Sequence, residues 1–207
     1  MNIKEIVQIP YSTSPKFTPC GGVQFKEYLQ DDYEARLIEY NMLMSDITFE
    51  SEVAENLKLV KKTSLAMNLV EEPFTDMIDM GLEIPDDIII MHKGKVEAAF
   101  VAMASSWNPR NVQGKSLSEV HQPVADNEAL IRASEGIWRS MVSGKNFHRH
   151  VWGISPLKGL SNHPRHKKPS IKSLDDLYFR IEHERTMTVD KDTAAFFIDV
   201  EVHPLSA

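Results

Sequence analysis

The fold is decided by residues 87–101, which read DIIIMHKGKVEAAFV. Two apolar runs, Asp87–Met91 and Val96–Val101, stand on either side of His92–Lys95, a short polar segment that contains a glycine. Short apolar runs separated by a tight glycine turn are typical of a β-hairpin. The sequence therefore predicts two adjacent antiparallel strands here.

Three further strands are predicted towards the C-terminus. They cover residues 147–155, 177–189 and 194–202, and in the last of them apolar residues alternate with acidic ones. A hairpin, an excursion and three consecutive strands predict a five-stranded antiparallel sheet with helices packed on one face. This α+β arrangement resembles the PAS fold, and with its helical excursion it spans residues 86–203.

The chain before the sheet divides into two parts. Several prolines and a pair of glycines predict an irregular N-terminal arm over residues 1–24. Apolar residues at helical spacing then predict two amphipathic helices, Val23–Met44 and Ser51–Met67, so that residues 25–70 form an N-terminal helical extension. A chain of 207 residues has the size of one domain, and we expect a single domain over residues 1–207.

The excursion from the sheet begins with residues 105–127, SSWNPRNVQGKSLSEVHQPVADN. A polar connection of this length is uncommon unless it carries function, so we expect the functional centre and a ligand here. Asp126 or Asn127 is placed to cap the helix that follows, and Gly144 to end it. One face of that helix is apolar and carries Leu130, Ala133, Ile137 and Met141.

Composition excludes several classes of protein. The net charge of −7 opposes binding to nucleic acid. Since the sequence contains neither a signal-like segment nor an apolar run of membrane-spanning length, we expect a cytoplasmic protein that does not enter a membrane. The single cysteine, Cys20, rules out an intramolecular disulfide. Nucleotide-binding glycine motifs are absent, so electrons for any redox reaction are expected to come from another protein.

Histidine, arginine and carboxylate side chains remain as candidates for chemistry. His121 precedes Pro123, which stiffens the backbone, and a rigid mount suits an axial metal ligand. The alternative is a loop histidine that caps backbone groups. Trp107 and Trp152 are expected in the core or in pocket walls, where they could flank a flat ring.

The strands supply two further candidate groups. His148 and His150 share one strand face and could bind a metal in a non-haem site. The segment from His163 to His166 could complete such a cluster, with Glu182 or Glu184 as the carboxylate of a two-histidine, one-carboxylate iron site. Arg180, Glu182 and Glu184 also share a strand face. If they point inward they are functional candidates, because buried charges are costly unless they are paired. If they point outward they are solvated surface charges.

At these residues the chain resembles the haem-dependent oxidative N-demethylase family. The resemblance rests on motifs: Ser106-Trp107-x-Pro109; Gly114-Lys115-Ser116-Leu117-x-x-Val120-His121-x-Pro123-Val124; Arg149-x-x-Trp152; and Arg180-x-Glu182-x-Glu184-Arg185-Thr186.

The resemblance implies a haem-binding PAS-like domain that uses dioxygen to remove an N-alkyl group from a small secondary amine. It makes His121 the proximal iron ligand, with Trp107, Lys115, Val124 and Trp152 around the haem. Arg149 or Arg180 would polarise dioxygen, and Glu182 or Glu184 would hold the cationic amine. Electrons would come from a separate flavin and iron–sulfur reductase subunit.

Other interpretations stay open on sequence alone. A haem-binding PAS-type gas or redox sensor and the non-haem metalloenzyme with His148 and His150 are the two alternatives. The basic run Arg165–Lys168 with Lys172 is either a solvated loop or a docking patch for an acidic electron donor. An oligomer is compatible with all three functions.

Overall fold

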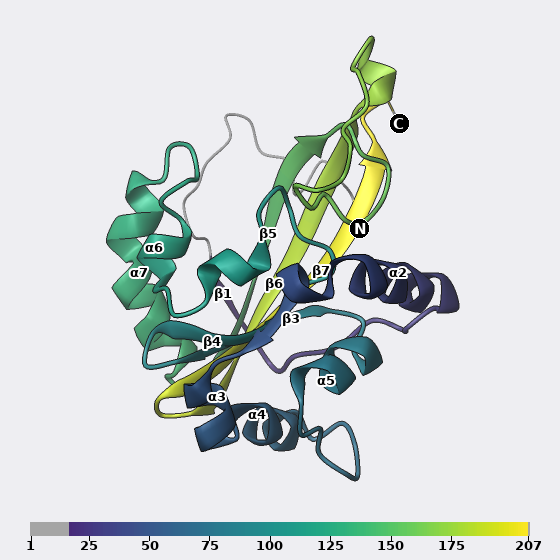
Figure 1. The fold of residues 1–207 in the computed structure, drawn as a ribbon. Helices are drawn as coiled ribbons and strands as arrows, with labels where there is room; N and C mark the ends of the chain where they lie inside the picture. The colour runs from purple at the N-terminus through teal and green to yellow at the C-terminus, as the bar shows by residue number, and fades with distance from the viewer. Residues whose placement is uncertain (1–16, 207) are drawn as a thin grey trace.

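The computed structural model describes residues 17–206, which contain one seven-stranded antiparallel sheet with strands in the order β1-β5-β6-β7-β3-β4-β2 (Figure 1). The strands are β1 (Thr18–Cys20), β2 (Thr48–Glu50), β3 (Asp87–His92), β4 (Lys95–Phe100), β5 (Asn146–Ser155), β6 (Tyr178–Asp190) and β7 (Thr193–Pro204).

The five long strands lie where the sequence predicts them, but the expected count of five is wrong. The additional strands, β1 and β2, lie at the two ends of the sheet, where β1 pairs with the start of β5 and β2 with the end of β4. Each has only three residues, which is too short for the two-residue period to show in the sequence.

The helices of residues 17–206 lie in two groups on opposite sides of the sheet (Figure 1). The first group is α2 (Gln30–Ile47), α3 (Glu52–Leu57), α4 (Leu59–Met67) and α5 (Met77–Glu83); the second is α6 (Leu117–Val120) and α7 (Glu128–Met141). Short 3-10 turns lie at Pro109–Val112 (η1) and Leu174–Asp176 (η2).

The prediction of helices on one face only is therefore wrong. On β3, Ile88 and Ile90 belong to the hydrophobic core beneath α2 to α5, whereas Met91 belongs to the core that packs against α6 and α7. Strands buried on both faces have continuous apolar runs rather than alternating ones. The run Ile88-Ile89-Ile90-Met91 is such a run, and two-sided burial is its physical reason.

The predicted helix boundaries and the N-terminal arm need three corrections. The first helix begins at Gln30, not at Val23. The second is interrupted at Lys58, whose left-handed backbone (φ 52°) separates α3 from α4, and β2 divides the predicted helical region 25–70. Of the predicted irregular arm, residues 1–16 lie outside the described residues, and the remainder contains β1.

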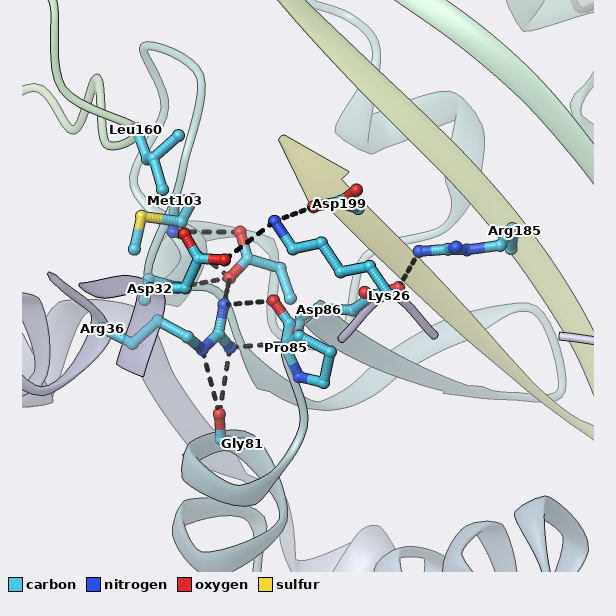
Figure 2. A network of polar contacts seen from close by, with 12 residues as sticks. Lys26, Asp32, Arg36, Gly81, Pro85, Asp86, Met103, Leu160, Arg185 and Asp199 are labelled. Atoms are coloured by element: carbon cyan, nitrogen blue, oxygen red, sulfur yellow. Dashed lines mark hydrogen bonds and ion pairs between the residues drawn. The ribbon is translucent and has the colours of Figure 1, made fainter. Parts of the chain in front are cut away.

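A buried ion pair joins the first helical group to the start of β3 (Figure 2). Arg36 of α2 is 1% exposed, and it donates to a carboxylate oxygen of Asp87 at 3.0 Å and to the carbonyl oxygens of Gly81 (3.0 Å) and Asp86 (2.8 Å). Asp87 in turn accepts hydrogen bonds from the backbone amides that follow β4, including that of Met103 at 3.0 Å. This network fixes the point at which the chain leaves the sheet for the long excursion.

Candidate functional site

A cavity of about 1040 Å³ lies between the sheet and the helices α6 and α7. Its walls include apolar side chains from two sides: the sheet contributes Ile89 and Met91 of β3 with Phe196 and Ile198 of β7, and α7 contributes Leu130, Ile137 and Met141. This volume is at the upper end of the range for small-molecule and cofactor pockets. All nine site residues named from the sequence line it: Trp107, Lys115, His121, Val124, Arg149, Trp152, Arg180, Glu182 and Glu184.

His121 lies at the C-terminal end of α6, a helix of one turn. The sequence motif that forms this turn is a capping box, in which Ser116 and Glu119 each bond to the other's backbone amide. The Nδ1 atom of His121 is 2.7 Å from the carbonyl oxygen of Leu117. A carbonyl oxygen can only accept, so Nδ1 carries the proton and Nε2 keeps its lone pair.

Electrostatics favour the neutral form of this imidazole. Burial lowers the pKa of His121, only partly opposed by its hydrogen bond to the Leu117 carbonyl, and the nearby Arg149 lowers it further. A neutral imidazole with its Nδ1 proton directed at a backbone carbonyl is the form in which histidine binds metals through Nε2. The side chain is therefore suited to be an axial ligand.

Glu182 and Glu184 both lie on the cavity face of β6. Glu184 lies directly across from Arg149 of β5 in the strand register, and the two side chains form an ion pair. The guanidinium of Arg149 also lies over the ring of Phe17, 5.1 Å from its centroid. The cation is thus fixed at the cavity wall.

Glu182 has a different environment. It accepts a hydrogen bond from the hydroxyl of Ser105, and its nearest cation is Arg180, with a distance of 3.7 Å between Nε and Oε1. Burial raises the pKa of Glu182, and the neighbouring charge of Glu184 raises it further. Glu182 therefore takes up a proton more readily than an exposed glutamate does.

Arg180 is buried, with 4% of its surface exposed. Its three nitrogen atoms donate to Ser105 and to the carbonyl oxygens of Met103 and Leu160. It thereby joins two loops at the polar end of the cavity, one after β4 and one after β5.

The remaining predicted residues lie around the rim. Lys115 and Val124 are exposed, and Trp107 is half-buried against the core on the α6–α7 side. Trp152 contacts the ring of Phe179 at a centroid distance of 6.0 Å. Strand alternation puts the Trp152 side chain on the opposite side of β5 from Arg149, so it reaches the cavity only at the sheet margin.

The predicted metal cluster around His148 and His150 does not form. His150 lies against His183, with 2.9 Å between their Nδ1 atoms, and strand register puts both on the opposite sheet face from Glu182 and Glu184. His163 and His166 do not join them, because His166 bonds to Glu39 at 2.8 Å and His163 is buried in the loop after β5. In residues 17–206, no group of three or more His, Cys, Asp or Glu side chains could hold a metal ion.

Sequence reasoning missed two contributors to the cavity wall. Ser105 bridges Arg180 and Glu182, and Asn162 binds Ser106 through its backbone carbonyl (3.0 Å) and its side-chain amide (2.7 Å). The positive φ of Ser106 (65°) is a strained conformation that these bonds hold. Asn162 lies more than fifty residues away in the sequence, and no local pattern indicates this pairing.

The basic run lies in the loop between β5 and β6. Arg165 pairs with Asp46 of α2 at 2.7 Å and His166 with Glu39, whereas Lys167, Lys168 and Lys172 are exposed. Two of the five basic residues are thus engaged within the chain. No helix in the described part of the chain is both long enough and apolar enough to cross a membrane.

Comparison with known proteins agrees with the sequence motifs. A search of curated proteins found no match. A family model does match, over residues 27–198, which is most of the chain and includes all nine site residues named from the sequence. That model is described as haem-dependent oxidative N-demethylase, alpha subunit-like, and the chain belongs to this family.

Proposed function

We propose that the protein is the haem-binding subunit of an oxygenase that removes an N-methyl group from a small secondary amine. The family description implies an oxidoreductase that depends on haem. The observation that carries the proposal is His121, whose proton on Nδ1 is directed at the Leu117 carbonyl so that Nε2 is available to an iron atom. We further propose that the chain forms one PAS-like domain, since the excursion that carries His121 lies between the second and third of the five long strands. We propose the cytoplasm as its location.

The residues of the cavity fit a haem. Its apolar walls and volume suit a large flat ring, and Trp107, Val124 and Trp152 are lining residues that would contact it. Lys115 at the rim would pair with a propionate. When bound, the haem supplies dioxygen activation, which no protein side chain provides.

Arg149 is the residue that we assign to dioxygen. Its pairing with Glu184 holds the guanidinium in place, and a fixed cation stabilises negative charge that develops on oxygen as it is reduced. Arg180 has its nitrogen atoms bonded to the two loops, so we assign it the role of holding Ser105 and Glu182 in position.

Glu182 is the residue that we assign to the amine. The carboxylate of Glu182 is largely buried, and its nearest cation, Arg180, lies at 3.7 Å with its nitrogen atoms bonded to other groups. A positively charged ligand would therefore offset the remaining cost of burying this anion. A protonated amine would donate to the carboxylate oxygens of Glu182 and be held beside the apolar wall. The electrons would come from a separate flavin and iron–sulfur reductase, for which the exposed Lys167 and Lys168 are a candidate docking surface.

An absorption spectrum of the purified protein is the first test. We expect a Soret band that is lost in His121→Ala and kept in the matched variant His148→Ala, whose side chain lies on the other face of β5 from Arg149. Haem bound normally by His121→Ala but lost from His148→Ala would refute the ligand assignment.

Turnover tests the reaction itself and separates an enzyme from a haem-based sensor. With a reductase, reduced cofactor and a panel of secondary amines, the protein should release formaldehyde. Glu182→Gln should raise the amine concentration for half-maximal rate more than Glu184→Gln does. A haem-loaded protein that forms no aldehyde from any amine in the panel would contradict the proposed reaction.

A further inference from the structure

Asn127 occupies the position of an N-cap residue but does not act as one. It directly precedes α7, where the sequence predicts a capping side chain, yet its side chain accepts no hydrogen bond from the helix. Asparagine at this position usually bonds to an amide of the first turn and stabilises the helix. The missing cap indicates that the side chain has another role.

The side-chain amide of Asn127 turns back towards α6. Its Nδ2 donates to the backbone carbonyl of His121 at 3.0 Å and to that of Gln122 at 2.8 Å. A primary amide has two N–H groups, and these two bonds use both of them. The His121 carbonyl also accepts from the backbone amide of Val124 at 3.0 Å.

The opposite side of His121 is held from within α6. The carbonyl of Leu117 accepts both the His121 backbone amide (3.2 Å) and the imidazole Nδ1 (2.7 Å). A helix of one turn is not stable by itself, because the entropy lost in ordering the first turn exceeds the stabilisation from its few hydrogen bonds. The side chain of Asn127 therefore ties this turn to α7, a helix of fourteen residues.

We propose that Asn127 is a positioning residue for His121: its amide fixes the backbone of the ligand so that the imidazole keeps its Nδ1 bond and presents Nε2 to the iron. This inference rests on the proposed function for the identity of the ligand. Residues that orient a metal ligand from behind usually change metal affinity about 10- to 100-fold when they are removed.

The substitution Asn127→Asp separates positioning from helix stability. Aspartate has the same shape, is an equally good N-cap and is favoured at a helix N-terminus, but it has no N–H to donate and repels the two carbonyl oxygens. We expect unchanged or slightly higher resistance of the haem-free protein to urea, together with haem affinity lowered about 10-fold or more. In haem-free protein, the Nδ1 proton of His121, followed by ¹⁵N NMR, should exchange with water faster than in the wild type.

Asn68→Asp is the matched control, because it adds the same charge at an exposed residue after α4, far from the cavity lining. It should leave haem affinity and Nδ1 exchange unchanged. Asn127→Asp with wild-type haem affinity and wild-type Nδ1 exchange would overturn the inference. If the wild type binds no haem, the proposed function fails, and the exchange of the Nδ1 proton still decides whether Asn127 positions His121.

Discussion

Replacing Arg36 by methionine tests the buried network that anchors the excursion. The substitution keeps the apolar stem but removes the guanidinium, which leaves the carboxylate of Asp87 buried without its cation and the carbonyls of Gly81 and Asp86 without their donor (Figure 2). Removing one partner of a buried ion pair costs about 3 to 5 kcal/mol. Since domains are stable by only about 5 to 15 kcal/mol, we expect a large part of the folding free energy to be lost.

Urea unfolding followed by tryptophan fluorescence measures this loss. With a slope of about 2 kcal/mol per molar urea, the midpoint should fall by about 1.5 to 2.5 M. The loss should be smaller at acidic pH, because burial already raises the pKa of Asp87 and Arg36 is the chief group that lowers it. Without the arginine, protonation of Asp87 removes the unpaired charge.

The exposed ion pair of α7 provides the control. Arg132 lies 3.6 Å from Glu128, and both side chains are largely exposed, so Arg132→Met should leave the midpoint almost unchanged. The double variant Arg36→Met with Asp87→Asn should recover part of the lost stability. If the free energy of unfolding fell by less than about 1 kcal/mol in Arg36→Met, or fell equally in the control, the buried pair would not contribute the stability expected of it.

Three other predictions concern charge. Burial, partly offset by its ion pair with an arginine, raises the pKa of Asp86 from 3.8 to about 6, so the folded state favours the protonated carboxyl. This contribution to stability is complete below about pH 4 and is lost as the pH rises through about 6. In calorimetric melts, the stability of the wild type relative to Asp86→Asn should therefore fall by about 3 kcal/mol between these two pH values. Ser105→Ala removes a hydrogen bond that lowers the pKa of Glu182. Amine binding, followed spectroscopically during acidification, should therefore be lost at a higher pH than in the wild type. An unchanged pH profile would exclude Glu182 as the amine site. Charge reversal at Lys167 and Lys168 should slow haem reduction by a reductase, most at low ionic strength, while reduction by dithionite stays the same; equal rates with the reductase would leave the lysines as solvated loop residues.

The five long strands could be predicted because their pattern is local. Alternation in residues 194–202 and the glycine turn after His92 depend on neighbours in the sequence. The side of the sheet that a helix covers depends instead on how its connections run in space, which is why the position of α6 and α7 opposite α2 to α5 was not predicted.

In the candidate site, too, the local patterns could be predicted and the contacts between distant segments could not. The shared face of Arg180, Glu182 and Glu184 follows from the strand period and was predicted. The inward direction of that face, and the contact of Arg180 with Leu160, depend on segments that meet only in the folded chain. Asn127 was predicted at the right position with a different role, because the sequence shows a good capping residue but not which groups compete for its amide.

The contacts of Arg180 also bear on how the cavity is completed during folding. Its bond to the carbonyl of Met103 joins positions that are 77 residues apart. Closing a loop of that length costs about 4 kcal/mol of chain entropy, which the contacts within the loop must offset. Met103 and Leu160 lie on loops that follow β4 and β5, so their contacts with Arg180 require the β3–β4 hairpin, β5 and β6 to be together. Because these contacts are long-range, we expect the polar end of the cavity to form after the local β3–β4 hairpin.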